Sequence, residues 1–199
     1  MRLHPVLYCF LVACAADPAT SPDQTDEPPI GGGDGKADGT GCATVINGQT
    51  IHVCNLSEVS PGIYRGARPD ARGLGDLASI LGIQTDIDLE KIESAITTET
   101  KQTAALGITL KREPMSYVTS PSDAQIDRIL AELNNPDLQP VFVHCQLGAD
   151  RTGLVVALDR VLYDNWAPAD ASKEMMDRGF HRIWLGLSHY FEERTGYDP

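Results

Sequence analysis

The sequence predicts an α/β fold in which a central, mostly parallel sheet is flanked by helices. From about residue 41 onward, segments with helical spacing of apolar residues alternate with short apolar strands. The run from Pro140 to His144 is almost wholly apolar, which is typical of a strand at the centre of a parallel sheet. A chain of 199 residues, of which 42% are hydrophobic, is long enough for one packed domain with tails and too short for two full domains.

Apolar spacing places the elements in order along the chain. Leu74, Leu77 and Ile80 recur at helical spacing, and Gly82 ends that helix. Beyond it we expect a strand over 83–89, a helix over 95–106 stopped by Gly107, a strand over 108–110, a helix from 121, a strand over 140–144, and helices over 153–163, 169–178 and 183–193.

Two of these helices allow finer expectations. In the helix from residue 121, Ser120 is expected as the N-cap, Pro121 as the first helical residue and Asp123 as the capping-box partner. In the last helix, the large side chains at helical spacing are expected to pack in the core rather than to form a binding face: Trp184, His189, Tyr190 and Phe191.

The first sixteen residues have the features of an export signal. Arg2 gives a positive start, an apolar stretch over 6–13 is too short to cross a bilayer, and small residues follow. The tetrapeptide at 11–14 resembles a bacterial lipobox, which would make Cys14 the lipidated first residue; cleavage after Ala15 by an ordinary signal peptidase is the alternative. We favour lipidation, and therefore an exported, membrane-anchored protein facing the periplasm or the cell exterior.

Residues 17–40 favour this interpretation because they resemble a tether. They hold four prolines, six acidic residues and one lysine, with hardly any apolar side chains, which predicts a disordered acidic linker. A calcium-binding interpretation of residues 31–39 would need several copies of such a repeat. No run of 18 apolar residues occurs, so contact with a membrane is expected only through the lipid.

The charge balance excludes one class of partner. The formal net charge is −12, from 28 acidic and 16 basic residues, whereas nucleic-acid binding needs a basic face.

The expected domain, residues 41–199, comprises an N-terminal hairpin over 41–58 and a core over 59–180.

Cysteine positions predict one disulfide and one unpaired thiol. Cys42 and Cys54 flank Asn47-Gly48, a dipeptide typical of tight hairpin turns, and in an oxidising compartment they would close the hairpin. Two buried thiols are the alternative. Cys145 is left without a partner, which in an exported protein requires an explanation.

Residues 144–153 explain why Cys145 would be an unpaired thiol. They run from a buried strand through a glycine-bearing loop into an apolar helix. Such a loop directs backbone N–H groups and the positive end of a helix dipole toward a bound anion. The planar guanidinium of Arg151 can donate hydrogen bonds to two phosphate oxygens, and the Cys145 thiol would ionise readily in this positive field. The phosphate-binding residues are expected to be Gln146, Leu147, Gly148, Ala149, Asp150 and Arg151.

The motif resembles that of the cysteine-dependent protein tyrosine and dual-specificity phosphatases, H-C-x-x-G-x-x-R-[ST]. Its fixed positions are matched by His144, Cys145, Gly148, Arg151 and Thr152. The stretch from Val59 to Phe180, with its Y-R-x-x-x-P segment at 64–69, is similar to the bacterial dual-specificity-like branch. An inert buried cysteine and a rhodanese-like sulfur carrier are the alternatives, and neither accounts for all these offsets.

The resemblance implies hydrolysis of phosphomonoesters in two steps without metal or cofactor. Cys145 would attack phosphorus to form a phosphocysteine, with Arg151 and the loop amides stabilising the equatorial oxygens, and water would then release phosphate. Thr152 would stabilise the departing thiolate, and His144 would orient the loop from the strand side.

The sequence departs from the family in its general acid. The family's aspartate, about thirty residues before the cysteine, has no counterpart in the stretch 112–119, where Glu113 is the available carboxylate or is simply solvated. Asp150 matches the D-R-T pattern of the myotubularins and certain bacterial phosphatases, which implies that it is the acid. The alternative for Asp150 is an ion pair with a neighbouring arginine.

The substrate class follows from charge. Ala149 stands where phosphoinositide and inositol-phosphate phosphatases often carry lysine, and residues 41–199 have a net charge of −8 from 14 basic and 22 acidic residues. Both facts favour a phosphorylated protein or a small phosphoester. An inositol-phosphate or phosphoinositide phosphatase and an inactive phosphate-binding pseudophosphatase are the alternatives. A basic rim would reverse this preference, and its candidates are Arg65, Arg68, Lys111 and Arg112.

Overall fold

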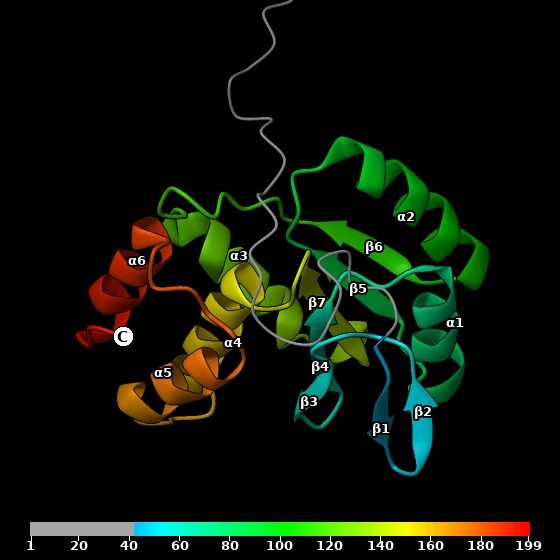
Figure 1. Cartoon of the computed structure of the whole chain (residues 1–199), viewed down its shortest axis with the longest axis horizontal. Helices are drawn as coiled ribbons and strands as arrows, with labels where there is room; N and C mark the ends of the chain where they lie inside the picture. Colours follow the sequence, from blue (N-terminus) through cyan, green and yellow to red (C-terminus); the bar gives the residue numbers. More distant parts are fainter. Residues whose placement is uncertain (1–41) are drawn as a thin grey trace, which may run out of the picture.

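The computed structural model describes residues 42–199 (Figure 1). In chain order the elements are β1 (Thr44–Ile46), β2 (Gln49–Ile51), β3 (Ser57–Ser60), β4 (Ile63–Ala67), α1 (Ala71–Ile80), β5 (Thr85–Asp88), α2 (Glu93–Leu106), β6 (Thr109–Arg112), α3 (Asp123–Leu133), a 3₁₀ turn (Pro136–Leu138), β7 (Val141–Cys145), α4 (Asp150–Leu162), α5 (Pro168–Asp177) and α6 (Leu185–Thr195). The expected signal at 1–16, Cys14 within it and the linker at 17–40 lie outside these residues.

The main sheet has the strand order β3-β4-β7-β5-β6, with β7 at its centre. Strands β4, β7, β5 and β6 are mutually parallel, and only the edge strand β3 pairs antiparallel to its neighbour. The predicted mostly parallel α/β sheet is therefore confirmed. Because the parallel strands end at one edge of the sheet, the loops that follow them gather there, where α/β proteins commonly bind ligands.

Side chains of β7 alternate between two cores. Val141 and Val143 pack into the larger core with α3, α4, α5 and α6, while Phe142 packs with α1 and the hairpin on the other face. Figure 1 shows the same division, with α1 and α2 on one side of the sheet and the remaining helices on the other. Burial on both faces explains the almost unbroken apolar run of this strand.

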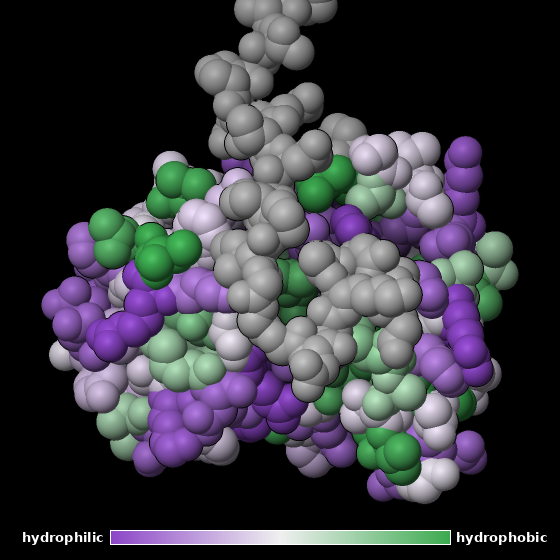
Figure 2. All heavy atoms as spheres, viewed as in Figure 1, coloured by the Kyte–Doolittle hydropathy of each residue, from purple (hydrophilic) through white to green (hydrophobic). Residues whose placement is uncertain are grey.

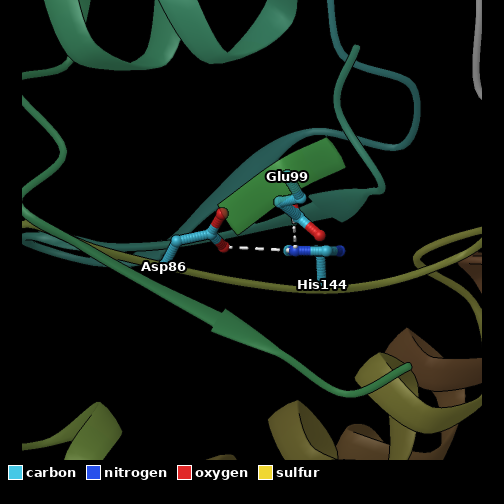
Figure 3. Close-up of side chains that lie close together, drawn as sticks. All are labelled: Asp86, Glu99 and His144. Carbon is cyan, nitrogen blue, oxygen red and sulfur yellow. Dashed lines mark ion pairs between the residues drawn. The ribbon is translucent and has the colours of Figure 1, made fainter. Parts of the chain in front are cut away.

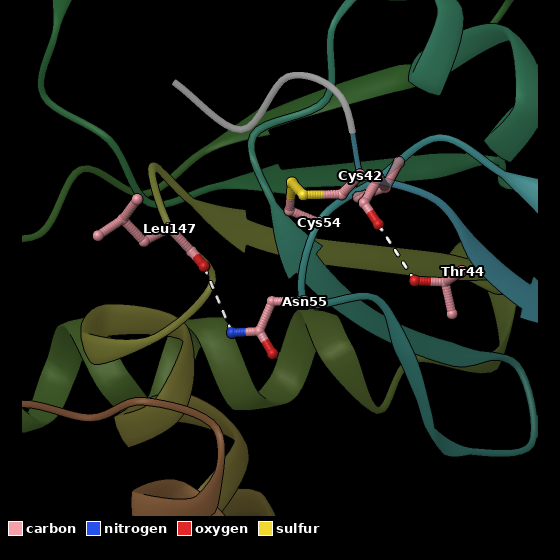
Figure 4. The surroundings of a disulfide bond; sticks show 6 residues. Cys42, Thr44, Cys54, Asn55 and Leu147 are labelled. Atoms are coloured by element: carbon pink, nitrogen blue, oxygen red, sulfur yellow. Dashed lines mark hydrogen bonds between the residues drawn. A yellow bond between two sulfur atoms is a disulfide. The ribbon is translucent and has the colours of Figure 1, made fainter. Parts of the chain in front are cut away.

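The N-terminal hairpin forms as predicted. Strands β1 and β2 pair with Ile46 opposite Gln49, so the turn consists of Asn47 and Gly48, at φ 52° and 77°. These left-handed dihedrals are those of the tight turns that Asn-Gly favours. The predicted disulfide between Cys42 and Cys54 is present and joins the two ends of the hairpin (Figure 4).

The start of α3 differs from the prediction. The N-cap is Ser122, whose side chain accepts a hydrogen bond from the N–H of Gln125, whereas the hydroxyl of Ser120 donates to the carbonyl of Gly186. Asp123 is the first helical residue, and its carboxylate accepts hydrogen bonds from Tyr190 and Arg194 instead of closing a capping box. Local spacing cannot separate two serines two residues apart when one of them has a distant partner.

Two further expectations need correction. Helix α4 begins at Asp150 rather than Gly153, so Asp150, Arg151 and Thr152 lie in its first turn. In α6, Tyr190 and Phe191 are buried as expected and Trp184 packs partly against the core, but His189 is exposed.

Among the described helices, none combines the length and the apolarity that crossing a membrane requires.

Candidate active site

The loop between β7 and α4 lies at the edge of the sheet where the parallel strands end. Cys145 is the last residue of β7, is 2% exposed and carries a free thiol. The first helical hydrogen bond of α4 runs from the N–H of Gly153 to the carbonyl of Ala149. The amides before Gly153 therefore have no partner within the helix, as is usual for the first turn, and can bind an anion.

Gly148 fits its position for two reasons. Its φ of +65° is in the left-handed region, which glycine adopts without a steric penalty. A Cβ atom at this position would lie 2.4 Å from the backbone carbon of Gly66 and 2.6 Å from the nitrogen of Ala67. The loop between β7 and α4, residues 146–149, can therefore pack directly on β4 only with glycine at position 148. We call it the phosphate loop, after the ligand that the motif predicts.

The carbonyl groups of the loop are anchored on its outer side. Gly148 O accepts hydrogen bonds from the Arg65 guanidinium at 2.6 Å and the Asn55 amide at 2.9 Å, and Leu147 O accepts one from Asn55 at 3.3 Å (Figure 4). Gln146 O accepts the N–H of Arg68 at 3.3 Å. In a trans peptide the N–H points opposite to the C=O. Each anchored carbonyl thus turns the following N–H toward the inside of the loop.

Arg65, one of the candidates for a basic rim, lies behind the loop. It is fully buried on β4, and burial lowers the pKa of its guanidinium to about 10, which leaves it charged at neutral pH. A buried positive charge behind the loop favours a bound phosphate on the opposite side. The Y-R-x-x-x-P resemblance singled out this arginine without assigning it that role.

Arg151 and Thr152 occupy the positions that the motif requires. Arg151 lies in the first turn of α4, and its guanidinium stands 5.7 Å from the centre of the Tyr117 ring, within the range of a cation–π contact. Tyr117 in turn meets Trp184 edge to face at 4.7 Å between ring centres. The Thr152 hydroxyl is buried and has no hydrogen-bond partner among residues 42–199.

Asp150 is paired with a histidine. Its carboxylate accepts a hydrogen bond of 2.7 Å from the backbone N–H of His181 and lies 3.1 Å from the His181 ring nitrogen Nδ1. Burial raises the pKa of Asp150, and the hydrogen bond from His181 opposes this rise. His181, which the sequence did not indicate, therefore joins the site.

Glu113 is neither solvated nor free. Its two oxygens accept hydrogen bonds of 2.6 Å each from Arg128 on α3, and the residue is buried. Both carboxylate oxygens are thus engaged by one guanidinium. This arrangement suits Glu113 to fastening the loop before α3, and it is poorly suited to donating a proton.

A buried charge cluster surrounds His144, the residue before Cys145 (Figure 3). His144 Nε2 is 3.2 Å from Asp86 Oδ1 on β5 and 2.9 Å from Glu99 Oε1 on α2. Burial alone lowers the pKa of His144, but the two carboxylates outweigh burial and raise it well above its usual value. Asp86, Glu99 and His144 are close enough together to share a metal ion, as are Asp88, Glu90 and His144. A protonated imidazole offsets part of the negative charge of Asp86 and Glu99.

This cluster predicts that stability falls in alkali. Burial raises the pKa of Asp88 and of Glu90, and the pKa of His144 is raised as well, so each group binds a proton more tightly in the folded state. Their stabilising effect is complete below the unfolded-state pKa values and is lost as pH rises through the folded-state values. Between pH 6 and pH 9 we expect His144 to cause the loss, with the free energy of unfolding falling by about 1–3 kcal/mol, since one pKa unit corresponds to about 1.4 kcal/mol.

Urea unfolding measured at both pH values checks this expectation. A His144→Gln variant, which cannot be protonated, should lose the part of the pH dependence that arises above pH 6. A wild-type protein whose stability is constant or increases between pH 6 and pH 9 would contradict the assigned charges.

The remaining candidates for a basic rim are neutralised by neighbouring acids. Arg68 pairs with Glu90 at 2.8 Å, and Lys111 pairs with Glu132 at 3.2 Å. Arg112 lies 3.8 Å from Asp88. The described residues therefore offer no cluster of unpaired cations among these candidates, which agrees with the expectation drawn from charge.

A recess and an apolar surface lie beside the loop between β7 and α4. A recess of about 590 Å³ borders Gln146 and is lined by Arg68, Thr98 and Gln102 among others. On another side, apolar side chains gather over the loop before α3 and the segment entering α6 (Figure 2). The exposed aliphatic residues there are Val118, Ile183 and Leu185, at 57%, 68% and 63% exposure. They adjoin Tyr117 and Trp184 in the sequence, which places an apolar rim beside Arg151.

Two dual specificity protein phosphatases are similar to this chain in sequence. The dual specificity protein phosphatase TpbA of Pseudomonas aeruginosa (strain UCBPP-PA14) is 30% identical over 133 residues, which are 63% of this chain and 55% of that protein. TpbA from the PAO1 strain is 29% identical over 133 residues. The chain spans about half the length of these curated relatives.

Solved structures share the fold. The crystal structure of P. aeruginosa TpbA superposes with a TM-score of 0.62 at 24% identity, covering 76% of this chain and 89% of that one. The core catalytic domain of the PP-IP phosphatase SIW14 from S. cerevisiae superposes with a TM-score of 0.59 at 24% identity, covering 70% and 87%. Residues 50–180, well over half of the chain, match the model described as the tyrosine phosphatase family. The chain therefore belongs to the tyrosine phosphatase family.

Proposed function

We propose that this protein hydrolyses phosphomonoesters through a phosphocysteine intermediate. The observation that carries the proposal is the anchoring of three successive loop carbonyls by Arg68, Asn55 and Arg65, which turns the following amides inward above Cys145. Convergent N–H groups beside a guanidinium form a site for a phosphate dianion. A thiol at the base of such a site is a nucleophile directed at phosphorus.

The chemistry balances in two steps. The Cys145 thiolate attacks phosphorus, an S–P bond forms, and the P–O bond to the leaving group breaks while an acid gives that oxygen a proton. Water then attacks the phosphocysteine, the S–P bond breaks, and the thiolate and inorganic phosphate are released. Arg151 and the loop amides stabilise the equatorial oxygens in both steps, and the unpaired hydroxyl of Thr152 is available to the departing sulfur.

Asp150 is our proposed general acid. It lies one residue before Arg151 in the first turn of α4, and burial raises its pKa toward the range in which a carboxyl group holds a proton. His181 contacts the same carboxylate and can fix its orientation. The engagement of Glu113 by Arg128 leaves Asp150 as the stronger candidate.

Replacement of Asp150 by asparagine tests this role. With an alkyl phosphate, whose leaving oxygen needs a proton, we expect kcat to fall by about 10²–10⁴-fold, the usual contribution of a general acid. With 4-nitrophenyl phosphate the loss should stay below about tenfold, since nitrophenolate leaves without a proton. Equal losses with both substrates would assign Asp150 to holding His181, and a His181→Ala variant would then show the same loss.

The proposed substrate is a phosphotyrosine-type aryl phosphate or another small phosphoester. The apolar rim at Val118, Ile183 and Leu185 suits an aromatic or peptide leaving group, and the pairing of nearby basic residues disfavours a polyanion. TpbA has been crystallised in complex with pTyr, which supports this choice. SIW14 is a PP-IP phosphatase, so an inositol phosphate is the second candidate.

We propose in addition that the protein is exported and anchored through a lipid on Cys14. The lipobox-like sequence at 11–14 and the acidic linker that follows support this location. The disulfide between Cys42 and Cys54 supports it independently, because disulfides persist in oxidising compartments. Metabolic labelling with a radioactive fatty acid, compared between wild type and Cys14→Ala, tests the anchor.

Phosphate release from a substrate panel tests the proposed activity. The panel contains a phosphotyrosine peptide, a phosphoserine peptide, 4-nitrophenyl phosphate and inositol hexakisphosphate. We expect the highest kcat/KM with the phosphotyrosine peptide. Preference for the inositol phosphate would establish the second candidate, and binding of tungstate without any turnover would identify a catalytically inactive phosphate-binding protein.

A further inference from the structure

We propose that Asn55 positions the phosphate loop for catalysis and that the Cys42–Cys54 disulfide holds Asn55 in place. The proposal rests on the phosphatase activity proposed above. It assigns a catalytic consequence to two features that lie outside the signature motif, in the segment between β2 and β3. Asn55 acts through the loop backbone and has no contact with the thiol, so it is a positioning residue.

The Asn55 side chain joins three carbonyl groups from two distant segments. Its Nδ2 donates to Gly148 O at 2.9 Å, to Leu147 O at 3.3 Å and to Arg178 O at 3.0 Å. The first two carbonyls belong to the phosphate loop. Arg178 ends α5 and lies three residues before His181, the partner of Asp150. One amide group therefore links the phosphate loop to the segment that contacts the proposed acid.

This linkage sets the direction of the loop amides. The carbonyls of Leu147 and Gly148 point toward Asn55, so the N–H groups of Gly148 and Ala149 point away from it and into the loop. Arg65 shares only the carbonyl of Gly148. Without Asn55 the carbonyl of Leu147 loses the hydrogen bond from the Asn55 amide, and the peptide before Gly148 is less restrained against rotation.

The backbone at Asn55 has little regular structure to support it. The residue lies after β2 ends at Ile51 and before β3 starts at Ser57, and its φ is +50°. Asparagine tolerates this left-handed conformation better than most residues, although glycine alone adopts it freely. A strand ladder therefore does not hold Asn55 in position, and its neighbours must do so.

Two contacts of Cys54 provide that support, of which Figure 4 shows the disulfide. The backbone carbonyl of Cys54 accepts the N–H of Ala67 at 2.9 Å, which ties it to the end of β4, beside Cys145 in the register of the sheet. Its sulfur is bonded to Cys42. The residue immediately before Asn55 is therefore fixed on both its main chain and its side chain, and the disulfide transmits its restraint to the phosphate loop through Asn55.

The arrangement imposes opposite redox requirements on two nearby sites. Cys145 must be a free thiol to attack phosphorus, whereas Cys42 and Cys54 must stay oxidised to restrain Asn55. A dithiol reductant would transfer two electrons and two protons to this disulfide, giving two thiols and a cyclic disulfide of the reductant. We therefore expect reduction to weaken phosphate binding in this protein.

The experiment compares three variants of the full chain: Asn55→Asp, Cys42→Ser combined with Cys54→Ser, and Thr44→Ala. Asn55→Asp keeps the shape of the side chain and removes its N–H donors. Thr44→Ala is the matched control, because it removes a hydrogen bond of 3.3 Å to Val53 O in the same hairpin without touching the loop. Steady-state kinetics, tungstate affinity by calorimetry and thermal unfolding are measured for each.

For Asn55→Asp we expect kcat/KM with 4-nitrophenyl phosphate to fall by about 10²-fold, the usual effect of misplacing a reactive group by about 1 Å. Tungstate affinity should fall by about tenfold or more at a temperature where the variant is folded. The double cysteine variant, and the wild type treated with dithiothreitol, should shift in the same direction. Thr44→Ala should stay within about twofold of wild type in both measurements.

Other outcomes overturn the proposal. Wild-type tungstate affinity in folded Asn55→Asp would show that the side chain does not position the loop. Weakened binding in Asn55→Asp together with unchanged binding in dithiothreitol-reduced wild type would remove the disulfide from the account, even if the double cysteine variant fails to fold. Tungstate binding needs no turnover, so a wild type that binds tungstate but releases no phosphate refutes the proposed activity and still tests the positioning.

Discussion

We expect replacement of Cys145 by serine to reduce phosphate release by about 10⁴-fold or more. A serine hydroxyl is a far weaker nucleophile than a thiolate, and this loop contains no base positioned to activate it among the contacts described. Removal of a nucleophile costs more than this in enzymes whose catalytic groups act as a unit. Stopped assays of phosphate release from 4-nitrophenyl phosphate measure the loss.

The Cys145→Ser variant should retain the phosphate site. The hydroxyl is smaller than the thiol, and the loop carbonyls keep their anchors on Asn55 and Arg65. We therefore expect tungstate affinity within about tenfold of wild type and an unchanged thermal unfolding midpoint. Residual activity above about one hundredth of wild type, in protein free of wild-type contamination, would show that another group attacks phosphorus.

We expect replacement of Arg151 by lysine to lower kcat/KM by about 10³-fold. The guanidinium offers a planar pair of donors to two phosphate oxygens, whereas the lysine ammonium is a single point charge on a flexible stem. Charge stabilisation by an arginine in phosphoryl transfer contributes about 10³–10⁵-fold. The same kinetic assay, with tungstate affinity measured alongside, determines whether binding or turnover carries the loss.

A conservative change at a second arginine provides the control. Arg128→Lys keeps a charge beside Glu113 and lies on α3, away from the phosphate loop, so its kcat/KM should remain near the wild-type value. Equal losses in Arg151→Lys and Arg128→Lys would indicate general destabilisation in place of a role for Arg151 in the transition state.

The parts of the fold that sequence predicts best are those with local causes. The buried strand at 140–144 is recognisable because both of its faces meet apolar cores, and the hairpin because Asn47 and Gly48 adopt left-handed dihedrals. Gly148 belongs to a motif whose spacing is fixed by the loop itself, where a side chain would overlap Gly66. Such constraints act over a few residues and leave a readable pattern.

The parts that sequence cannot predict depend on distant partners. Asn55 contacts Gly148 across 93 positions, and His181 contacts Asp150 across 31. Nothing in the neighbourhood of either residue marks such a contact. The assignment of Ser120 as a helix cap fails for the same reason, since its hydroxyl is taken by Gly186, 66 positions away.

Buried charged residues are the second feature of this fold that the sequence does not predict. His144, Asp86 and Glu99 come from three different elements, and only the assembled sheet places them within hydrogen-bond distance (Figure 3). Sequence alone predicts that charged residues lie on the surface, because burial of an unpaired charge is costly. Pairing removes much of that cost here, and it holds His144 in place next to Cys145.

Trapping of the covalent intermediate tests the central claim most directly. Wild-type protein is mixed with ³²P-labelled phosphotyrosine peptide, quenched in acid within milliseconds, and digested, and the label is assigned to a peptide by mass spectrometry. We expect one label per chain, bound through sulfur in the peptide that contains Cys145 and missing in Cys145→Ser. Label on any other residue, or label that persists in Cys145→Ser, would contradict the account.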